Sequence, residues 1–193
     1  MRTAILCLAA CTLACAVSGA SAQGGPPDTA KLLAAQRSAM QSLARMDGVW
    51  RGEAKTTLRD GQVRIITQTE RIGPMLDGTI KVIEGRGYDA TGAVVFNAFG
   101  VVSYDVSKAS FSMRSHAQGL SGDFVFKPTP DGYSWDIPAG PATIHYSATI
   151  RDGVLHEVGE RVVPGAQPVR FFEMTLRRVG DTDWPAGGAV PPK

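Results

Sequence analysis

The most constraining feature of the chain is a repeated Asp-Gly dipeptide, which alternates with runs rich in Val, Ile, Thr, Phe and Tyr. Asp-Gly favours the type I′ turn, in which both central residues have positive φ and the twist matches that of the flanking strands. Each dipeptide is therefore predicted to be a hairpin tip, and together they predict an antiparallel meander. The dipeptides are Asp47-Gly48, Asp60-Gly61, Asp77-Gly78, Asp131-Gly132 and Asp152-Gly153.

A period-two pattern between the turn signals predicts about ten strands from residue 48 to residue 179. Such a sheet cannot stay flat, because accumulated twist curls it, and closure into a barrel removes its exposed edges. We therefore predict one all-β domain, an up-and-down antiparallel barrel. The predicted strands span residues 49–58, 62–72, 79–85, 93–104, 111–118, 120–127, 133–137, 143–150, 154–163 and 169–179.

Residues 23–47 are predicted to hold a short Gly/Pro linker and one amphipathic α-helix. Asp28 is a candidate N-cap, and good helix formers continue to about Arg45. The apolar stripe of this helix is approximated by Leu32, Gln36, Ala39, Leu43 and Met46. At the other end, residues 180–193 consist largely of Gly, Pro and Ala and predict a flexible C-terminal tail.

Residues 1–22 have the pattern of a secretory signal peptide, with Arg2, an apolar stretch over 4–17 and Ala20-Ser21-Ala22 as a cleavage site. Cleavage near Ala22 predicts a periplasmic or secreted protein. The alternative is a lipoprotein anchored at Cys11, because Leu8-Ala9-Ala10-Cys11 has the residue types of a lipobox. Cleavage at Ala22 would remove every cysteine of the chain, so no disulfide is expected.

Removal of 22 residues from 193 would leave 171, enough for a single core, with 19 basic and 18 acidic residues. This balance provides no field to attract nucleic acid, and nucleic-acid binding is not expected. No later apolar run is long enough for a membrane span, so none is predicted. The oligomeric state is left open.

The segment Gly48-Val49-Trp50-Arg51-Gly52 resembles the start of the barrel in the calycin superfamily of lipocalins and fatty-acid-binding proteins. There a Gly-x-Trp opens the first strand, the indole plugs one end, and an Arg from the last strand packs across it. The resemblance implies a lipocalin-like barrel closed by Gly48, Trp50 and either Arg177 or Arg178, with Arg178 favoured and a cation–π contact to the indole. The other interpretation is that Trp50 is simply a large core aromatic of another barrel or sandwich.

A longer pattern is similar to a family of uncharacterised exported bacterial proteins with lipocalin-like barrels. It comprises the helix, Leu-Ala-Arg-Met-Asp-Gly-Val-Trp-Arg-Gly-Glu, and a meander ending in Phe-Glu-Met-Thr-Leu-Arg-Arg, and it covers about Leu43 to Val179. This similarity implies the fold and no activity. The Trp-Arg-Gly-Glu segment is also similar to the haem-binding nitrobindins, whose iron ligand is a His near the last strand. Residues 169–179 contain no His, so haem is not expected, and no other cofactor is.

The histidines show no metal-ligand spacing, and no metal site is predicted. His116 and His145 are expected to face solvent or a wet cavity. His156 shares a strand face with Glu160, which is either an inward polar contact or an ordinary neighbour on one face. Gly85-Arg86-Gly87 resembles a fragment of a phosphate loop but has no helix after it, and it is interpreted as a strand end. With no Gly-x-Ser-x-Gly either, no catalytic residue is predicted.

Aromatic and Met residues are distributed over many strands, as a ligand-lined or side-chain-filled barrel interior requires. An inward Arg would suit a carboxylate ligand, and candidates are Arg64, Arg71, Arg86, Arg114, Arg151 and Arg161. The residues predicted to line a pocket are Phe99, Tyr104, Met113, Phe124, Trp135, Tyr146, His156 and Phe172.

The predicted function is binding or carriage of a small apolar molecule in the cell envelope. One alternative is an enzyme, an isomerase or hydrolase that uses one His and one carboxylate on a hydrophobic substrate. Another is a structural or interaction module whose barrel is filled by its own side chains and whose helix, or tail around Trp184, docks to a partner.

Overall fold

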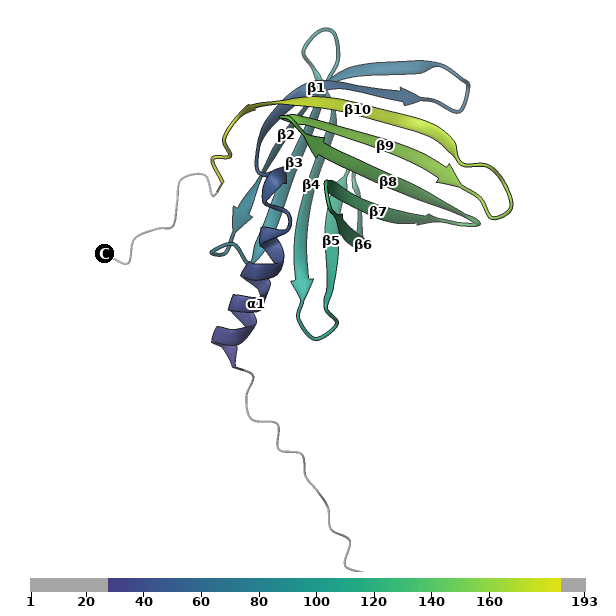
Figure 1. Cartoon of the computed structure of the whole chain (residues 1–193). Helices are drawn as coiled ribbons and strands as arrows, with labels where there is room; N and C mark the ends of the chain where they lie inside the picture. Colours follow the sequence, from purple (N-terminus) through teal and green to yellow (C-terminus); the bar gives the residue numbers. More distant parts are fainter. Residues whose placement is uncertain (1–27, 185–193) are drawn as a thin grey trace, which may run out of the picture.

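The computed structural model describes residues 28–184, which form a closed antiparallel barrel of ten strands with an α-helix at one end (Figure 1). The helix α1 spans Thr29–Gln41 and is followed by the 3-10 turn η1, Ala44–Met46. The predicted signal peptide, the predicted linker over 23–27 and the last nine residues of the predicted tail, 185–193, lie outside the described residues. The strands are β1 Gly48–Thr57, β2 Val63–Met75, β3 Ile80–Tyr88, β4 Val94–Asp105, β5 Ser110–Ala117, β6 Leu120–Thr129, β7 Gly132–Ala139, β8 Ala142–Arg151, β9 Val154–Val162 and β10 Val169–Gly180.

Each strand pairs with the next one along the chain, and β1 closes the barrel by pairing with β10. The closing register runs from Val49↔Gly180 to Thr56↔Phe172. The predicted all-β antiparallel barrel of ten strands is confirmed. No described helix is both long and apolar enough to cross a membrane.

Three of the Asp-Gly dipeptides lie in hairpin connections, as predicted: Asp60-Gly61, Asp77-Gly78 and Asp152-Gly153. At Asp131-Gly132 the prediction is displaced by one residue, because the turn is Pro130-Asp131 and Gly132 begins β7, paired with Thr129. In Asp77-Gly78 and Asp152-Gly153 both residues have positive φ, which the type I′ turn requires. The prediction is wrong for Asp47-Gly48, which joins η1 to β1. Glycine is favoured there because its φ is +148° and a Cβ would lie 3.1 Å from the backbone oxygen of Gly180.

The helix begins as predicted and ends earlier. Asp28 is the N-cap, since its Oδ1 accepts a hydrogen bond from the backbone N–H of Lys31 at 3.2 Å. The chain then leaves the α-helix after Gln41 and turns through η1, which brings Leu43 and Met46 into the barrel end. Of the predicted stripe, only Leu43 and Met46 are fully buried. Leu32, at the start of the helix, is 37% exposed.

The end of the barrel beside η1 is a solid plug of side chains. Trp50 is 1% exposed, and its indole N–H donates to the backbone oxygen of Met46 at 2.9 Å. This bond ties the 3-10 turn to the first strand. The largest fully buried side chains here and in the layer above are Trp50, Phe126, Leu43, Met46, Ile72, Leu155, Leu176 and Val102.

Arg178 lies directly across from Trp50 in the β1–β10 register. Its Nε and Nη2 each donate to the backbone oxygen of Asp47 at 3.3 Å, and Nη2 also contacts Asp181 at 2.8 Å. Arg177 lies across from Arg51 and is exposed. Arg178 thus contributes hydrogen bonds to Asp47 and Asp181 at the barrel end.

The chain after β10 turns back along the outer face of β2. The absence of a side chain at Gly73 admits Thr182 and Trp184, whose atoms lie within 3 Å of the position a Cβ would take. The Trp184 indole N–H donates to the backbone oxygen of Arg71 at 3.4 Å, and the Arg71 guanidinium lies 5.2 Å from the ring centroid. This is a cation–π contact between Arg71 and Trp184, and it is a different contact from the predicted one between Arg178 and Trp50, which is not found among the described residues.

Candidate functional site

The half of the barrel away from α1 encloses a cavity of about 440 Å³. Its deep end is formed by Ile72, Phe126 and Leu155, which border the solid plug. Because β1 runs away from the helix and β10 runs back towards it, Thr56 and Phe171 mark the opposite end of the cavity. The volume lies in the range of ordinary small-molecule sites.

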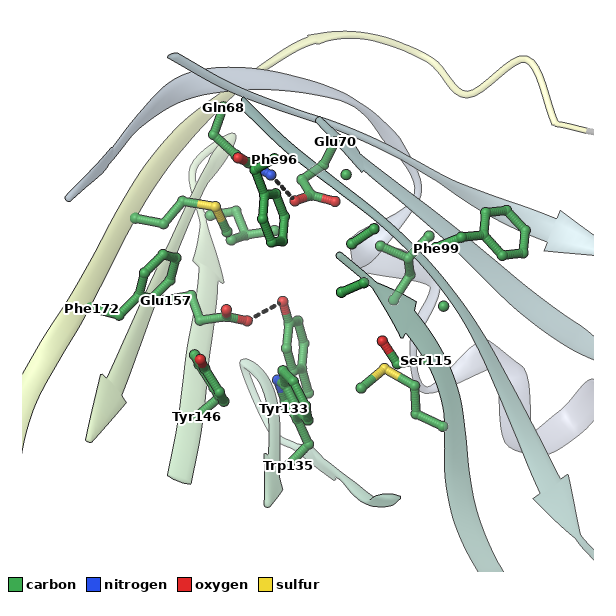
Figure 2. Close-up of a pocket in the computed structure, with 18 of the residues that line it drawn as sticks. Gln68, Glu70, Phe96, Phe99, Ser115, Tyr133, Trp135, Tyr146, Glu157 and Phe172 are labelled. Carbon is green, nitrogen blue, oxygen red and sulfur yellow. Dashed lines mark hydrogen bonds between the residues drawn. The ribbon is translucent and has the colours of Figure 1, made fainter. Parts of the chain in front are cut away.

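Five of the eight predicted pocket residues border this cavity: Phe99, Met113, Trp135, Tyr146 and Phe172. The rings of Trp135 and Tyr146 are stacked, with centroids 4.5 Å apart, and Phe172 meets Tyr146 edge-on at 5.8 Å. Phe99 is an exception within this set, because its ring points away from the cavity (Figure 2) and the residue is 38% exposed. Its backbone, and not its side chain, borders the cavity.

The other three predicted pocket residues lie elsewhere. Tyr104 packs against Phe111, at 4.8 Å between centroids, close to the helix-covered end. Phe124 lies beside the cavity and contacts the ring of Trp135 at 5.6 Å. His156 is on the outer face, where its Nε2 lies 2.9 Å from Glu173 Oε1. This corrects the inward interpretation of His156 and Glu160.

The most distinctive side chains of the cavity are two carboxyls that the sequence reasoning missed. Glu70 of β2 and Glu157 of β9 both point into it (Figure 2). Tyr133 donates its hydroxyl hydrogen to Glu157 Oε2 at 2.7 Å, and Gln68 Nε2 donates to Glu70 Oε1 at 2.8 Å. Glu70 is the cross-strand partner of Trp50, so the carboxyls lie deep in the barrel, next to the plug.

Two glycines of β3 create the space that Gln68 and Glu70 occupy. Gly85 pairs with Glu70 and Gly87 pairs with Gln68. A Cβ on Gly85 would lie 2.9 Å from Glu70 Oε1, and a Cβ on Gly87 would lie 3.1 Å from Gln68 Oε1. The prediction of a strand end at Gly85-Arg86-Gly87 is therefore wrong, since these residues lie within β3 and form the wall behind the polar side chains.

Burial raises the pKa of both carboxyls. The pKa of Glu70 is raised to about 8, by burial first and then by the negative charges of Glu157 and Glu84, against the hydrogen bond from Gln68. The pKa of Glu157 is raised to about 7 by burial, while hydrogen bonds from the side chains of Tyr133 and Trp135 lower it. Burial also raises the pKa of Tyr146 to about 12. Near neutral pH the two carboxyls therefore titrate as an interacting pair.

No Lys, Arg or His belongs to the lining of this cavity, as far as residues 28–184 describe it. The expected inward Arg is thus not found: Arg86, Arg114 and Arg151 form ion pairs with Glu84, Asp123 and Asp131. Lys81 is buried, but it pairs with Asp47 in the helix-covered half. The partners of the cavity carboxyls are neutral, namely the amide of Gln68 for Glu70 and the hydroxyl of Tyr133 and the indole of Trp135 for Glu157.

The histidines contribute nothing to this site. His116 is exposed, and Nδ1 of His145 lies 2.7 Å from Oδ1 of Asp136. Within the described part of the chain, no three His, Cys, Asp or Glu side chains are grouped so that they could hold a metal ion.

The barrel wall is least complete between β6 and β7. These strands share four residue pairs, from Phe126↔Trp135 to Thr129↔Gly132, all towards the helix-covered end. Beyond them β6 extends to Leu120 and β7 to Ala139 without pairing to each other. The rings of Phe124 and Trp135 meet where the two strands separate. The cavity half therefore has a weaker seam in its wall.

Comparison of the sequence with protein-family models gives no match, and comparison with curated proteins gives none either. The fold and the site define a closed ten-stranded antiparallel β-barrel with an internal cavity, aromatic walls and two deep carboxyls.

Proposed function

We propose that the protein binds or carries a small, largely apolar molecule inside its barrel. The observation that carries this proposal is the cavity of about 440 Å³, whose lining is mostly aliphatic and aromatic with a few convergent polar groups. Ligand sites typically combine such apolar walls with a small number of polar side chains that orient the ligand. A barrel filled by its own side chains would leave no such space.

The lipocalin-like character of the barrel belongs to this proposal. It is supported by the meander order of the strands and by Trp50, which plugs the end where the first strand begins. Fold alone does not determine function, so the proposal rests on the cavity, and the fold is consistent with it. Action in the cell envelope follows from the signal-peptide pattern of residues 1–22, with a lipid anchor at Cys11 as the alternative.

The first test is native mass spectrometry of the protein purified gently from the envelope fraction of cells that express the full chain. A mass in excess of the denatured chain is expected, and the released molecule identifies the ligand. The denatured mass also shows whether cleavage occurred at Ala22 or whether Cys11 is acylated. A bare protein is then titrated with Nile red, a neutral apolar dye.

A matched pair of variants locates the binding. Gly100→Leu places a side chain into the cavity, where a Cβ makes ordinary contacts with Met113 at 3.5 Å or more. Ser112→Leu adds the same side chain on the exposed outer face of β5. Dye binding should fall in the first variant and persist in the second. Equal binding by both, or no ligand and no dye binding at all, would overturn the proposal.

The paired carboxyls favour acid/base catalysis on a bound apolar substrate as a second candidate function. Two carboxyls with pKa values of about 8 and 7 in one cavity have the property expected of proton-transfer groups. An enzyme that uses His156 together with a carboxylate is not supported, because the His156 ring is on the outer face of the barrel. Incubation of the released ligand with the bare protein separates the candidates: a carrier returns it unchanged, and an enzyme returns a product.

A further inference from the structure

We propose that the ligand carries a protonated amine or a similar organic cation on an apolar frame, with Glu70 and Glu157 as its counter-charges. This inference rests on the proposed function, since it names the chemical class of molecule that the cavity takes. It depends on three features of the described residues: the charge of the lining, the position of the carboxyls and the aromatic faces beside them.

The charge of the cavity is unbalanced. Its titratable acids are two glutamates, and the lining given by residues 28–184 includes no basic side chain. An ionised carboxyl away from water is strongly disfavoured unless it is paired. Gln68 and Tyr133 donate hydrogen bonds but bring no positive charge. A cationic ligand would supply the missing charge, in a low-dielectric space where such pairing is strong.

The two carboxyls reach the same space from different parts of the wall. Glu70 projects from β2 and Glu157 from β9, and β1 and β10 separate these strands in the barrel. Gln68 uses one oxygen of Glu70, and Tyr133 uses one oxygen of Glu157. Each carboxylate has a second oxygen with which to accept hydrogen bonds from a ligand. An ammonium group has donors in several directions, so a ligand that carries one can donate hydrogen bonds to the oxygens of this cavity.

Aromatic rings surround Glu157 on one side. Figure 2 shows Tyr133, Trp135 and Tyr146 close to its carboxyl, and Phe172 on the same side of the cavity. The negative face of an aromatic ring attracts a cation, most strongly for Trp and in a desolvated site. A carboxylate next to stacked Trp and Tyr rings is a combination suited to organic cations. An anionic ligand would meet repulsion from the same groups.

The experiment uses two probes of nearly the same shape. Benzyltrimethylammonium has a permanent positive charge, and neopentylbenzene is its neutral isostere with carbon in place of nitrogen. Both compete with Nile red for the wild-type protein, so the measured quantity is the ratio of their affinities. At pH 9, where both carboxyls are largely ionised, we expect the cation to bind about tenfold more tightly or better, through Coulomb attraction to the carboxylates and cation–π contact. The preference should shrink towards pH 5, because protonation removes the counter-charges while the charge of the probe is constant.

Variants identify the groups responsible. Glu70→Gln and Glu157→Gln should each reduce the cation-to-neutral ratio several-fold at pH 9, and the double variant should abolish it. The neutral probe reports in each case whether the cavity persists. Glu173→Gln is the matched control, since Glu173 lies on the outer face, where its Oε1 is 2.9 Å from His156 Nε2.

A second pair of variants tests the position of Glu70 without changing any charge. Gly85→Ala should displace the carboxyl and lower the ratio, because the added Cβ would lie within about 3.1 Å of both its oxygens. Gly100→Ala adds the same methyl group to another part of the wall, with only ordinary contacts to Met113, and should preserve the ratio.

The outcomes separate this inference from the function on which it rests. Binding of the neutral probe with no preference for the cation would overturn the organic-cation ligand and leave the carrier function standing. A preference that survives in the double Glu variant would also overturn it, because the attraction would then arise elsewhere. Failure of both probes and of Nile red, in a protein that also retains no ligand, would overturn the two proposals together.

Discussion

The two halves of the barrel share one continuous sheet and differ in almost everything inside it. In the helix-covered half Trp50, Ile72 and Leu155 are at most 1% exposed, and the indole N–H is bonded to Met46. In the other half the same strands surround a cavity with two carboxyls that have only neutral hydrogen-bond partners. The strand pairing is complete around the plug and incomplete between β6 and β7 near the cavity.

The change from solid plug to open cavity occurs along individual strands, from one inward-facing residue to the next, two positions away. Each of these strands therefore contributes a large apolar residue to the plug and a small or polar one to the cavity, so stability and ligand binding are separated along the barrel axis. The inward residues change from Trp50 to Gly52 and Ala54 on β1, from Ile72 to Glu70 and Gln68 on β2, and from Leu155 to Glu157 and Gly159 on β9.

The largest expected effect is on stability, from loss of the plug. Trp50→Ala removes a fully buried side chain and its hydrogen bond, and should lower the free energy of unfolding by about 3–5 kcal/mol in urea titrations. Trp135→Ala is the comparison variant, because that indole already borders empty space and should cost clearly less. Equal losses would show that the cavity half is as tightly packed as the plug.

The next effect is on the pH dependence of stability. The pKa of Glu70 is about 8 in the folded protein, above its ordinary value, so folding favours the protonated form. The stability associated with that proton is fully present below the ordinary pKa and is lost as the pH rises through about 8. Glu70→Gln should therefore be more stable than the wild type at pH 9, by about 2–4 kcal/mol at one pKa unit per 1.4 kcal/mol, with little difference at pH 4.

Glu173→Gln is the control for this pH dependence, because folding lowers the pKa of Glu173 and raises that of Glu70. The hydrogen bond to His156 lowers the pKa of Glu173, so any stability it contributes is present above the ordinary pKa and is lost as the pH falls. This variant should gain nothing at pH 9. If Glu70→Gln also gains nothing in thermal unfolding at pH 9, the carboxyl has a partner that offsets its burial, and the contrast between the halves is weaker.

Local signals were sufficient to predict the barrel but not the site. Asp-Gly turns and period-two runs act over a few residues, and they predicted the ten strands and three of the hairpin tips. The inward face of β9 was ambiguous, because Val154, Leu155 and Val158 put apolar groups on both sides. The tight turn at Asp152-Gly153 could have resolved this ambiguity. It pairs Arg151 with Val154, so Leu155 and Glu157 lie on the same face of the sheet as Ile150. Gly85 was interpreted as part of a strand end, because its role depends on Glu70 of the neighbouring strand, which its local sequence does not show.

The smallest expected effect is local and involves the seam. In an antiparallel sheet the N–H groups of successive residues point alternately to the two neighbouring strands. Residues 120–125 of β6 pair with β5 and not with β7, whereas residues 50–56 of β1 pair with both β10 and β2. In hydrogen-exchange mass spectrometry about half of the amides of the β6 segment should exchange quickly, while the β1 segment stays protected. Full protection of β6 would mean that the wall is closed there, and a bound ligand would then have to enter through the end of the barrel.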